Sequence, residues 1–262
     1  MKKIITLFII IIGSVGFANA QNNIKQELVT DRPDQTESAF TVPKGFLQIE
    51  TGILSETDET DVVKEKINAL NTTLFRFGLL DNWELRFGYE YLDYTYTDKL
   101  TSSEISFNGS GPLVIGTKIL IAEEDGYIPQ LAFLGHLTLP GTGKDEFETN
   151  YLAPDFRFAL EYTISEQISF GANIGTEWDS SHPRSNNFYS FVLGIGILEN
   201  LGMFLESYGY IIEKSDPDHR VDFGITYSIL DNLQLDASAG LGINDLAPDS
   251  FISAGLSYRL PE

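Results

Sequence analysis

Charged side chains recur at every second position inside otherwise apolar segments of this 262-residue chain. The clearest case runs from Trp83 to Tyr91, where acidic and basic residues alternate with aromatic and aliphatic ones. Residues two apart in a strand point to the same face, so such a segment carries its charges on one side. We predict that the following charged side chains line one interior surface: Arg76, Glu84, Arg86, Glu90, Lys118, Asp155, Arg157 and Glu161.

Two roles are open to such a surface. Opposite charges on neighbouring strands form ladders of ion pairs, and in a pore such ladders narrow the channel and set its selectivity, as rings of charge do. Alternatively, the pairs only hold a barrel wall rigid and hydrated. Both interpretations require strands that bring these rows of charge together.

Residues that could support hydrolysis are sparse. The chain has no Cys, which removes thiol nucleophiles and thiolate metal ligands. A barrel lipid hydrolase would present an outward His with a Ser two residues later, whereas the nearest match, His136 with Thr138, is predicted to face inward. His182 and His219 stand in expected loops without the close spacing of metal ligands. We therefore expect no catalytic residue, no metal site and no cofactor.

The segment from Gln21 to Lys44 differs from the rest because it shows no alternation and contains two prolines. Asp31-Arg32-Pro33-Asp34 predicts a turn with charges on both sides. The segment is either a disordered periplasmic tail or a plug folded into a lumen. We favour a plug whose charged side chains pair with charges of the wall: Asp31, Arg32, Asp34 and Glu37.

The first twenty residues have the layout of a cleaved secretory signal. Two lysines follow Met1, the run from Ile4 to Ile12 is apolar except for Thr6, and Ala18-Asn19-Ala20 supplies small residues for cleavage. Cleavage removes two basic residues and no acidic one, so the formal charge of −21 becomes −23. Such acidity excludes nucleic acid as the main partner, since nucleic acid requires a basic face.

The remaining chain, residues 45–262, consists of segments of about 10 to 13 residues that alternate apolar and polar side chains. We expect twelve strands, at 45–55, 67–78, 83–95, 110–122, 127–139, 150–162, 167–178, 187–199, 201–212, 219–230, 233–244 and 250–260. Short turns alternate with longer polar connections, which we place at 56–66, 96–109, 140–149, 179–186, 213–218 and 245–249. We expect no substantial helix after residue 20.

These features predict an all-β fold, an antiparallel transmembrane β-barrel of about twelve strands. Short turns on one rim, longer loops on the other and an even strand number are typical of outer-membrane barrels. A soluble sandwich or lipocalin-like barrel would show the same alternation with its apolar face inside. The export signal and the aromatic residues near segment ends, such as Trp83 and Trp178, favour the membrane.

The N-terminal residues Thr30-Asp31-Arg32-Pro33-Asp34-Gln35-Thr36-Glu37-Ser38, followed by residues 41–45 and 48–52, resemble the start of a known family. It is the outer-membrane "transporter" family named for the phenol-degradation meta-pathway proteins. Leu137-Thr138-Leu139-Pro140-Gly141-Thr142-Gly143 is similar to that family's Leu-Pro-Thr-Gly strand end, with one Gly inserted. The resemblance implies an outer-membrane barrel that passes small solutes, aromatic or hydrophobic compounds among them, and supplies no catalytic residues. One departure is the C-terminus, which ends Tyr258-Arg259-Leu260-Pro261-Glu262 instead of on an aromatic residue.

Together these patterns predict a channel in the outer membrane of a Gram-negative cell. Its expected partners are outer-membrane lipid and lipopolysaccharide, the barrel-assembly machinery and a small-molecule solute, and the sequence assigns no oligomeric state. A structural or adhesive barrel that transports nothing is the main alternative, and a barrel lipid hydrolase is the less favoured one.

Overall fold

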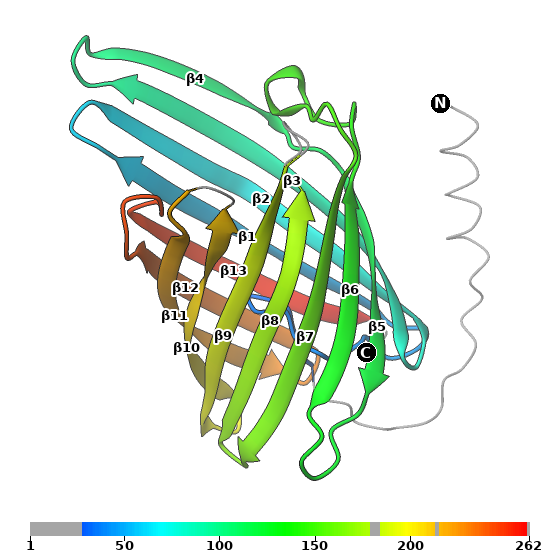
Figure 1. Ribbon diagram of the computed structural model, residues 1–262. Helices are drawn as coiled ribbons and strands as arrows, with labels where there is room; N and C mark the ends of the chain where they lie inside the picture. The colour runs from blue at the N-terminus through cyan, green and yellow to red at the C-terminus, as the bar shows by residue number, and fades with distance from the viewer. Residues whose placement is uncertain (1–27, 179–183, 213–214, 261–262) are drawn as a thin grey trace, which may run out of the picture.

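The alternating segments form an antiparallel β-barrel in the computed structural model, which describes residues 28–178, 184–212 and 215–260 (Figure 1). The predicted signal peptide, residues 1–20, lies outside the described residues, as do residues 21–27 and His182. The strands are β1 (Leu47–Glu59), β2 (Val63–Leu80), β3 (Trp83–Asp98), β4 (Ser103–Ser110), β5 (Val114–Ala122), β6 (Gln130–Thr138), β7 (Ala153–Ser165), β8 (Ile168–Trp178), β9 (Ser185–Leu198), β10 (Leu201–Ile212), β11 (Asp218–Leu230), β12 (Leu233–Gly242) and β13 (Ser250–Leu260).

Hydrogen bonds between the first and last strands close the barrel. β1 pairs with β13 from Leu47 opposite Leu260 to Thr57 opposite Ser250. From β5 to β13 each strand pairs with the next one along the chain, and β3 pairs with both β2 and β5. The barrel therefore has twelve strand positions, which confirms the predicted fold class.

One strand was not predicted. β4 pairs with residues 91–98 of β3, whereas β5 pairs with residues 83–88 of the same strand, so β4 and β5 share one position in the wall. The break between them contains Pro112, which has no backbone N–H to donate to a sheet. β4 overlaps the expected loop 96–109, and that assignment is wrong; the alternation in β4 is short, because only Ile105 and Phe107 interrupt its polar residues.

The two rims differ as expected. The connections β2–β3, β7–β8, β9–β10 and β11–β12 are tight turns of two residues, at 81–82, 166–167, 199–200 and 231–232. On the opposite rim β1 to β4 extend past the other strands, at the upper left of Figure 1. The predicted loop 56–66 is accordingly only residues 60–62, because β1 and β2 continue as a paired hairpin.

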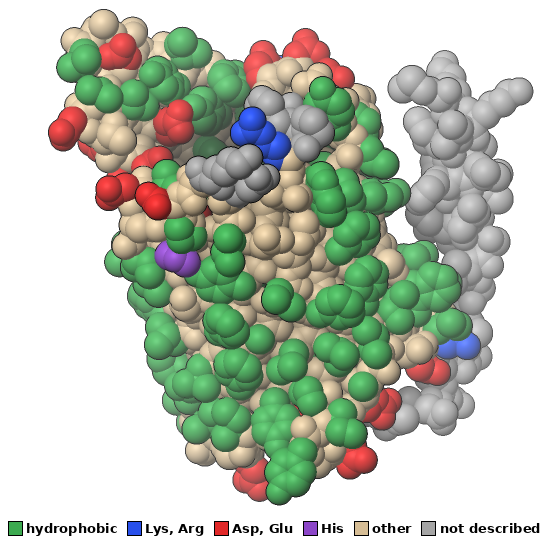
Figure 2. Space-filling view, viewed as in Figure 1, with side chains coloured by type: hydrophobic (Ala, Val, Ile, Leu, Met, Phe, Trp, Pro, Cys, Tyr) green, Lys and Arg blue, Asp and Glu red, His purple; other side chains and the backbone are tan. Residues whose placement is uncertain are grey.

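Successive side chains point alternately to lipid and lumen. In β3, Leu85 is 43% and Phe87 37% exposed, whereas Glu84 and Arg86 between them are 0% and 4% exposed. Apolar side chains cover the middle of the face seen in Figure 2, and acidic ones gather at its upper and lower edges. The only helical element in the described ranges is a 3-10 turn, Asp145–Phe147, and none of the described residues forms a helix long and apolar enough to cross a membrane.

Aromatic side chains also fill part of the interior, which the sequence analysis did not anticipate. Phe188, Tyr208 and Phe251 are buried together, with Leu54 and Tyr210 packed against them. They come from β9, β10, β13 and β1, so they occupy one side of the lumen.

A charged substitution on the outer face tests the position of the apolar band. Phe158 lies near the middle of β7 and is 49% exposed. Phe158→Arg should cost about 2 to 4 kcal/mol of folding free energy in vesicles, because it places a charge in the hydrocarbon core. Ile197→Arg, next to the turn at 199–200, should cost only about 0 to 1 kcal/mol. Urea titrations with heat-dependent gel mobility as readout measure both, and equal costs would contradict this placement.

Candidate functional site

The segment from Leu28 to Lys44 lies inside the barrel, where its backbone bonds to inward-facing side chains of the wall. The amide of Gln48 on β1 donates to the Val29 carbonyl at 2.8 Å, and the Glu84 carboxylate on β3 accepts from the Val42 N–H at 2.7 Å. The segment ends beside Gly78, where an added Cβ would lie 2.1 Å from the Pro43 carbonyl oxygen. Glycine at position 78 therefore permits the close approach.

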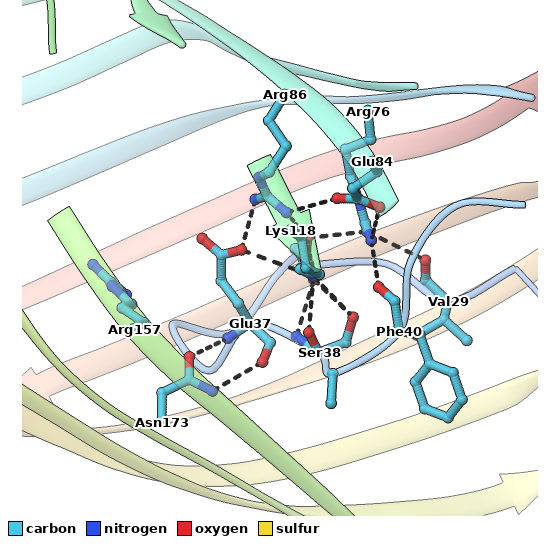
Figure 3. A network of polar contacts seen from close by, with 12 residues as sticks. Val29, Glu37, Ser38, Phe40, Arg76, Glu84, Arg86, Lys118, Arg157 and Asn173 are labelled. Carbon is cyan, nitrogen blue, oxygen red and sulfur yellow. Dashed lines mark hydrogen bonds and ion pairs between the residues drawn. The ribbon is translucent and has the colours of Figure 1, made fainter. Parts of the chain in front are cut away.

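Three buried cations surround the carboxylate of Asp31. Arg76 Nη1 lies 3.0 Å, Arg86 Nη1 2.7 Å and Lys118 Nζ 2.8 Å from its oxygens. The sheet register brings these cations together, because Arg76 is opposite Arg86 and Glu84 is opposite Lys118. Burying charges is costly unless they are paired, so the wall requires acidic partners at this point. Figure 3 shows how Arg76, Arg86 and Lys118 lie relative to one another and to Glu84.

Wall carboxylates complete this cluster. Glu84 bonds to Arg76 at 2.9 Å and to Arg86 at 3.0 Å, and Glu50 bonds to Arg76 at 2.8 Å. This is a cross-strand ladder of the kind predicted for Arg76, Glu84, Arg86 and Lys118. Burial alone would raise the pKa of Asp31, which precedes the first strand, but Arg76, Lys118 and Arg86 hold that pKa well below its usual range.

Arg32 binds the wall on both sides of the β1–β13 closure, and one of its contacts is a 3.2 Å hydrogen bond to Thr72 on β2. Its guanidinium donates to Asp236 on β12 at 3.0 Å and to Ser253 on β13 at 3.1 Å. It lies against Gly52 and Gly255, which are paired between β1 and β13, and a Cβ added at either glycine would lie 2.4 Å from Arg32 Nη2. The segment thus contacts acidic as well as cationic side chains of the wall.

Glu37 is held at both its backbone and its side chain. Its carboxylate lies 2.6 Å from Arg86 Nη2. Its N–H donates to the Asn173 amide oxygen at 2.8 Å, and the amide nitrogen of Asn173 donates back to the Glu37 carbonyl at 2.9 Å. The sequence does not predict this role of Asn173, which lies on β8, because a single neutral side chain on an inward face gives no distinctive pattern.

Asp34 departs from the predicted pairing with wall cations. Burial, then the carboxylates of Glu206 and Asp222, raise the pKa of Asp34 well above its usual range. Glu206 accepts hydrogen bonds from the Gln35 N–H at 2.7 Å and from the Thr36 hydroxyl. Asp34 therefore faces acidic groups of β10 and β11, and the prediction of an ion pair for it is wrong.

Asp155 and Arg157 form a second cluster. It lies near the start of β7, toward the rim opposite the short turns. Asp155 lies 3.4 Å from His136 Nδ1 and 3.2 Å from Arg157 Nε. The Arg157 guanidinium also lies 3.5 Å from Glu177 and covers the Phe188 ring at 4.0 Å. Each charged side chain of this cluster thus has a partner within the wall.

Glu90 and Glu161, the other predicted lumen residues, lie outside both clusters. Glu161 accepts a hydrogen bond from the Ala39 N–H at 3.4 Å. The Glu90 carboxylate lies beside Gly111, where an added Cβ would meet it at 2.6 Å. These two acids therefore do not take part in the ion pairs around Asp31.

Two cavities flank the segment inside the lumen. One, of about 400 Å³, reaches the turn at residues 165–167 and is lined by Asp34, Glu37 and Glu161. The other, of about 410 Å³, is lined by Glu37 and Arg86, together with His136 and Trp178 toward the opposite rim. Glu37 lines both cavities. The arrangement can hold a small molecule on either side of the segment.

Comparisons with known proteins agree with this architecture. The family model described as "Putative MetA-pathway of phenol degradation" matches residues 30–260. An outer membrane channel from Pseudomonas putida F1 aligns with a TM-score of 0.64 at 14% identity, covering 89% of this chain and 100% of that chain. The translocator domain of the autotransporter NalP from Neisseria meningitidis gives 0.53 at 10% identity, covering 83% and 89%. The NanC porin gives 0.52 at 10% identity, covering 80% and 98%.

At these identities the structural likeness shows a shared outer-membrane barrel fold. No protein of curated function matches the chain.

The glycine pair beneath Arg32 provides a test of the docked segment. Gly255→Ala should displace the guanidinium from Asp236, because the added Cβ would overlap it. The chain has no Cys, so Gln35→Cys gives a single thiol, and its labelling by a hydrophilic maleimide should accelerate in the Gly255→Ala background. Gly135→Ala is the matched control, since its Cβ would lie 3.5 Å from the nearest atom. Unchanged labelling would show that Arg32 does not hold the segment.

Proposed function

Because the chain belongs to the family described as "Putative MetA-pathway of phenol degradation", as the residues around Asp31-Arg32-Pro33 indicated, we propose that it is an outer-membrane channel for small solutes. The segment 28–44 acts in it as a plug. Aromatic or hydrophobic compounds are among the solutes that the family description suggests. A twelve-stranded barrel is wider than an eight-stranded one, whose interior side chains can fill, and narrower than a general porin.

The observation that carries the proposal is the bridge that the segment forms across the lumen. Asp31 and Glu37 bind cations of β3 and β5, whereas the Gln35 N–H and the Thr36 hydroxyl bind Glu206 on β10, six strand positions away from β3. A cavity of about 400 Å³ lies on each side of this bridge. Such a plug restricts passage to molecules that can displace part of it.

The proposed location is the outer membrane of a Gram-negative cell, reached by export through the signal at residues 1–20. The exposed apolar side chains of the outer face would contact membrane lipid and lipopolysaccharide, and the assembly machinery would insert the barrel. The acidic upper rim seen in Figure 2 favours cations at the extracellular mouth.

Acidic side chains outnumber basic ones on the inward face of the described strands. The acids are Glu50, Glu56, Glu84, Glu90, Asp155, Glu161, Glu177, Glu206, Asp218, Asp222 and Asp236, and the bases are Arg76, Arg86, Lys118, Arg157, Arg220 and Arg259. Fixed charge in a pore sets which ions enter it. The open channel should therefore prefer cations as its conducting ions.

Removal of the plug is the direct test. Deleting residues 22–40 removes Asp31, Arg32 and Glu37, and should raise the single-channel conductance in planar bilayers because the lumen is no longer bridged. Heat-dependent gel mobility checks that the shortened chain still folds. A folded deletion variant with the conductance of the full chain would contradict the plug.

Ion preference gives a second test on the same deletion variant. Its reversal potential in a KCl gradient should indicate cation selectivity, and Arg86→Glu or Arg157→Glu should increase that selectivity. Lys99→Glu is a control, since Lys99 is exposed beyond β3 and pairs with Glu59 near the rim. A reversal potential that does not respond to either lumen substitution would assign these arginines to wall stability alone.

An adhesive barrel remains the second candidate because one observation favours it. β1 to β4 extend beyond the other strands and present a sheet outside the expected membrane region (Figure 1). Liposome swelling with small sugars and aromatic acids separates the two functions. Swelling supports the channel, whereas a barrel that stays closed to every solute even after deletion of residues 22–40 supports the adhesive role.

A further inference from the structure

The side chain of Glu37 separates the two luminal cavities. It is one wall of the cavity of about 400 Å³ near the short-turn rim and one wall of the cavity of about 410 Å³ toward the opposite rim. The Glu37 peptide is fixed by two hydrogen bonds to Asn173, so its backbone can stay in place while the side chain rotates. Joining the cavities therefore requires a smaller movement than withdrawal of the whole plug.

Arg86 binds the Glu37 carboxylate through only part of its guanidinium edge. Nη2 lies 2.6 Å from Glu37, and Nη1 contacts Asp31 and Glu84. The Nε–H is buried and has no hydrogen-bond partner among the described residues. Buried donors in native proteins are nearly always satisfied, so an orphan N–H at this position requires an explanation.

The Nε and Nη2 atoms together form an edge that matches the two oxygens of a carboxylate. A guanidinium binds a carboxylate best through two parallel N–H···O bonds. Lys118 Nζ lies 4.0 Å from the Glu37 carboxylate. Two cations thus flank one carboxylate position, which Glu37 occupies with a single hydrogen bond to Arg86 (Figure 3).

The cavity beside Arg86 supplies an apolar surface for the rest of such a ligand. Leu74, Val114 and Ala153 line it, together with His136. Asp155 and Glu177 also line the cavity, and both are paired with Arg157. Its volume of about 410 Å³ is ample for one ring, since a cavity of about 150 Å³ accommodates benzene. A molecule with an apolar body and a single carboxylate satisfies both parts of the site.

We propose that Arg86 recognises the carboxylate of a small organic acid, which binds Nε and Nη2 together, displaces the Glu37 side chain and so joins the two cavities. This inference rests on the proposed channel function and names one class of solute for it. The net negative charge of the lumen disfavours anions in general. The cations around Glu37 create a local positive charge that attracts a carboxylate at this one position. The tethered Glu37 competes at an effective concentration in the millimolar range, and the solute must therefore act at millimolar concentrations.

Tryptophan fluorescence tests binding without requiring transport. The chain has two Trp residues, and Trp178 lines the cavity beside Arg86. In the Trp83→Phe variant of the full chain, benzoate should change the fluorescence of Trp178 in a saturable way at millimolar concentrations. Benzamide, a neutral molecule of nearly the same shape, should have no saturable effect. Equal responses to the two compounds would overturn the proposal.

Substitutions identify the residue that binds. Arg86→Lys keeps the charge beside Asp31 but loses the paired N–H edge, and should weaken the benzoate response at least about tenfold. Glu37→Gln removes the competing carboxylate and should strengthen it. Arg220→Lys is the matched control, since Arg220 pairs with Asp218 and Glu56 away from both cavities. Benzoate affinity that is unchanged in folded Arg86→Lys protein would refute Arg86 as the binding residue.

Channel recordings separate this inference from the proposed function. Benzoate, but not benzamide, should raise the open probability of the Trp83→Phe channel, and Arg86→Lys should abolish the effect. A channel that opens on deletion of residues 22–40 but ignores benzoate would refute the carboxylate site and leave the channel function standing. A barrel that never conducts would refute the channel function itself.

Discussion

The carboxylate of Asp31 is the group on which the interior of this barrel depends. Arg76, Arg86 and Lys118 converge on it from three strands, at distances of 2.7 to 3.0 Å. Glu84 and Glu50 of the wall offset two of these three buried positive charges, and Asp31 offsets the third. The segment that carries Asp31 therefore completes the ion pairing of the wall, and the same ion pairs hold the segment in the lumen.

The rest of the lumen is arranged around this segment. Paired glycines on β1 and β13 leave room for the Arg32 guanidinium, so it can bond to Asp236 on β12. The side chains of Phe188, Tyr208 and Phe251 fill one side of the interior. Two cavities lie beside the segment, and Glu37 lines both of them. In the proposed channel, a solute that passes between these cavities would have to pass Glu37.

Several features could be predicted from the sequence, and the failures have physical causes. Alternation located the twelve strand positions, because a strand with one face to lipid and one to a lumen has a period of two. β4 was not predicted because its apolar face has only two apolar residues, Ile105 and Phe107, which is too few for a clear alternation. Asp34 was expected to meet a cation, but the fold turns it toward Glu206 and Asp222. Composition cannot distinguish a cationic wall from an acidic one when both lie in the same lumen.

The sequence by itself determined which face of each strand is apolar and which residues point into the lumen, since these depend only on local spacing. It also determined that residues 28–44 do not form a strand, because they lack alternation and contain two prolines. Only the tertiary structure decided the partners. Closure between β1 and β13, the register that places Arg76 opposite Arg86, and the path of the segment bring together residues that are up to 221 positions apart, such as Arg32 and Ser253. Spacing along the chain carries no information about such contacts, because they follow from how twelve strands close around one segment.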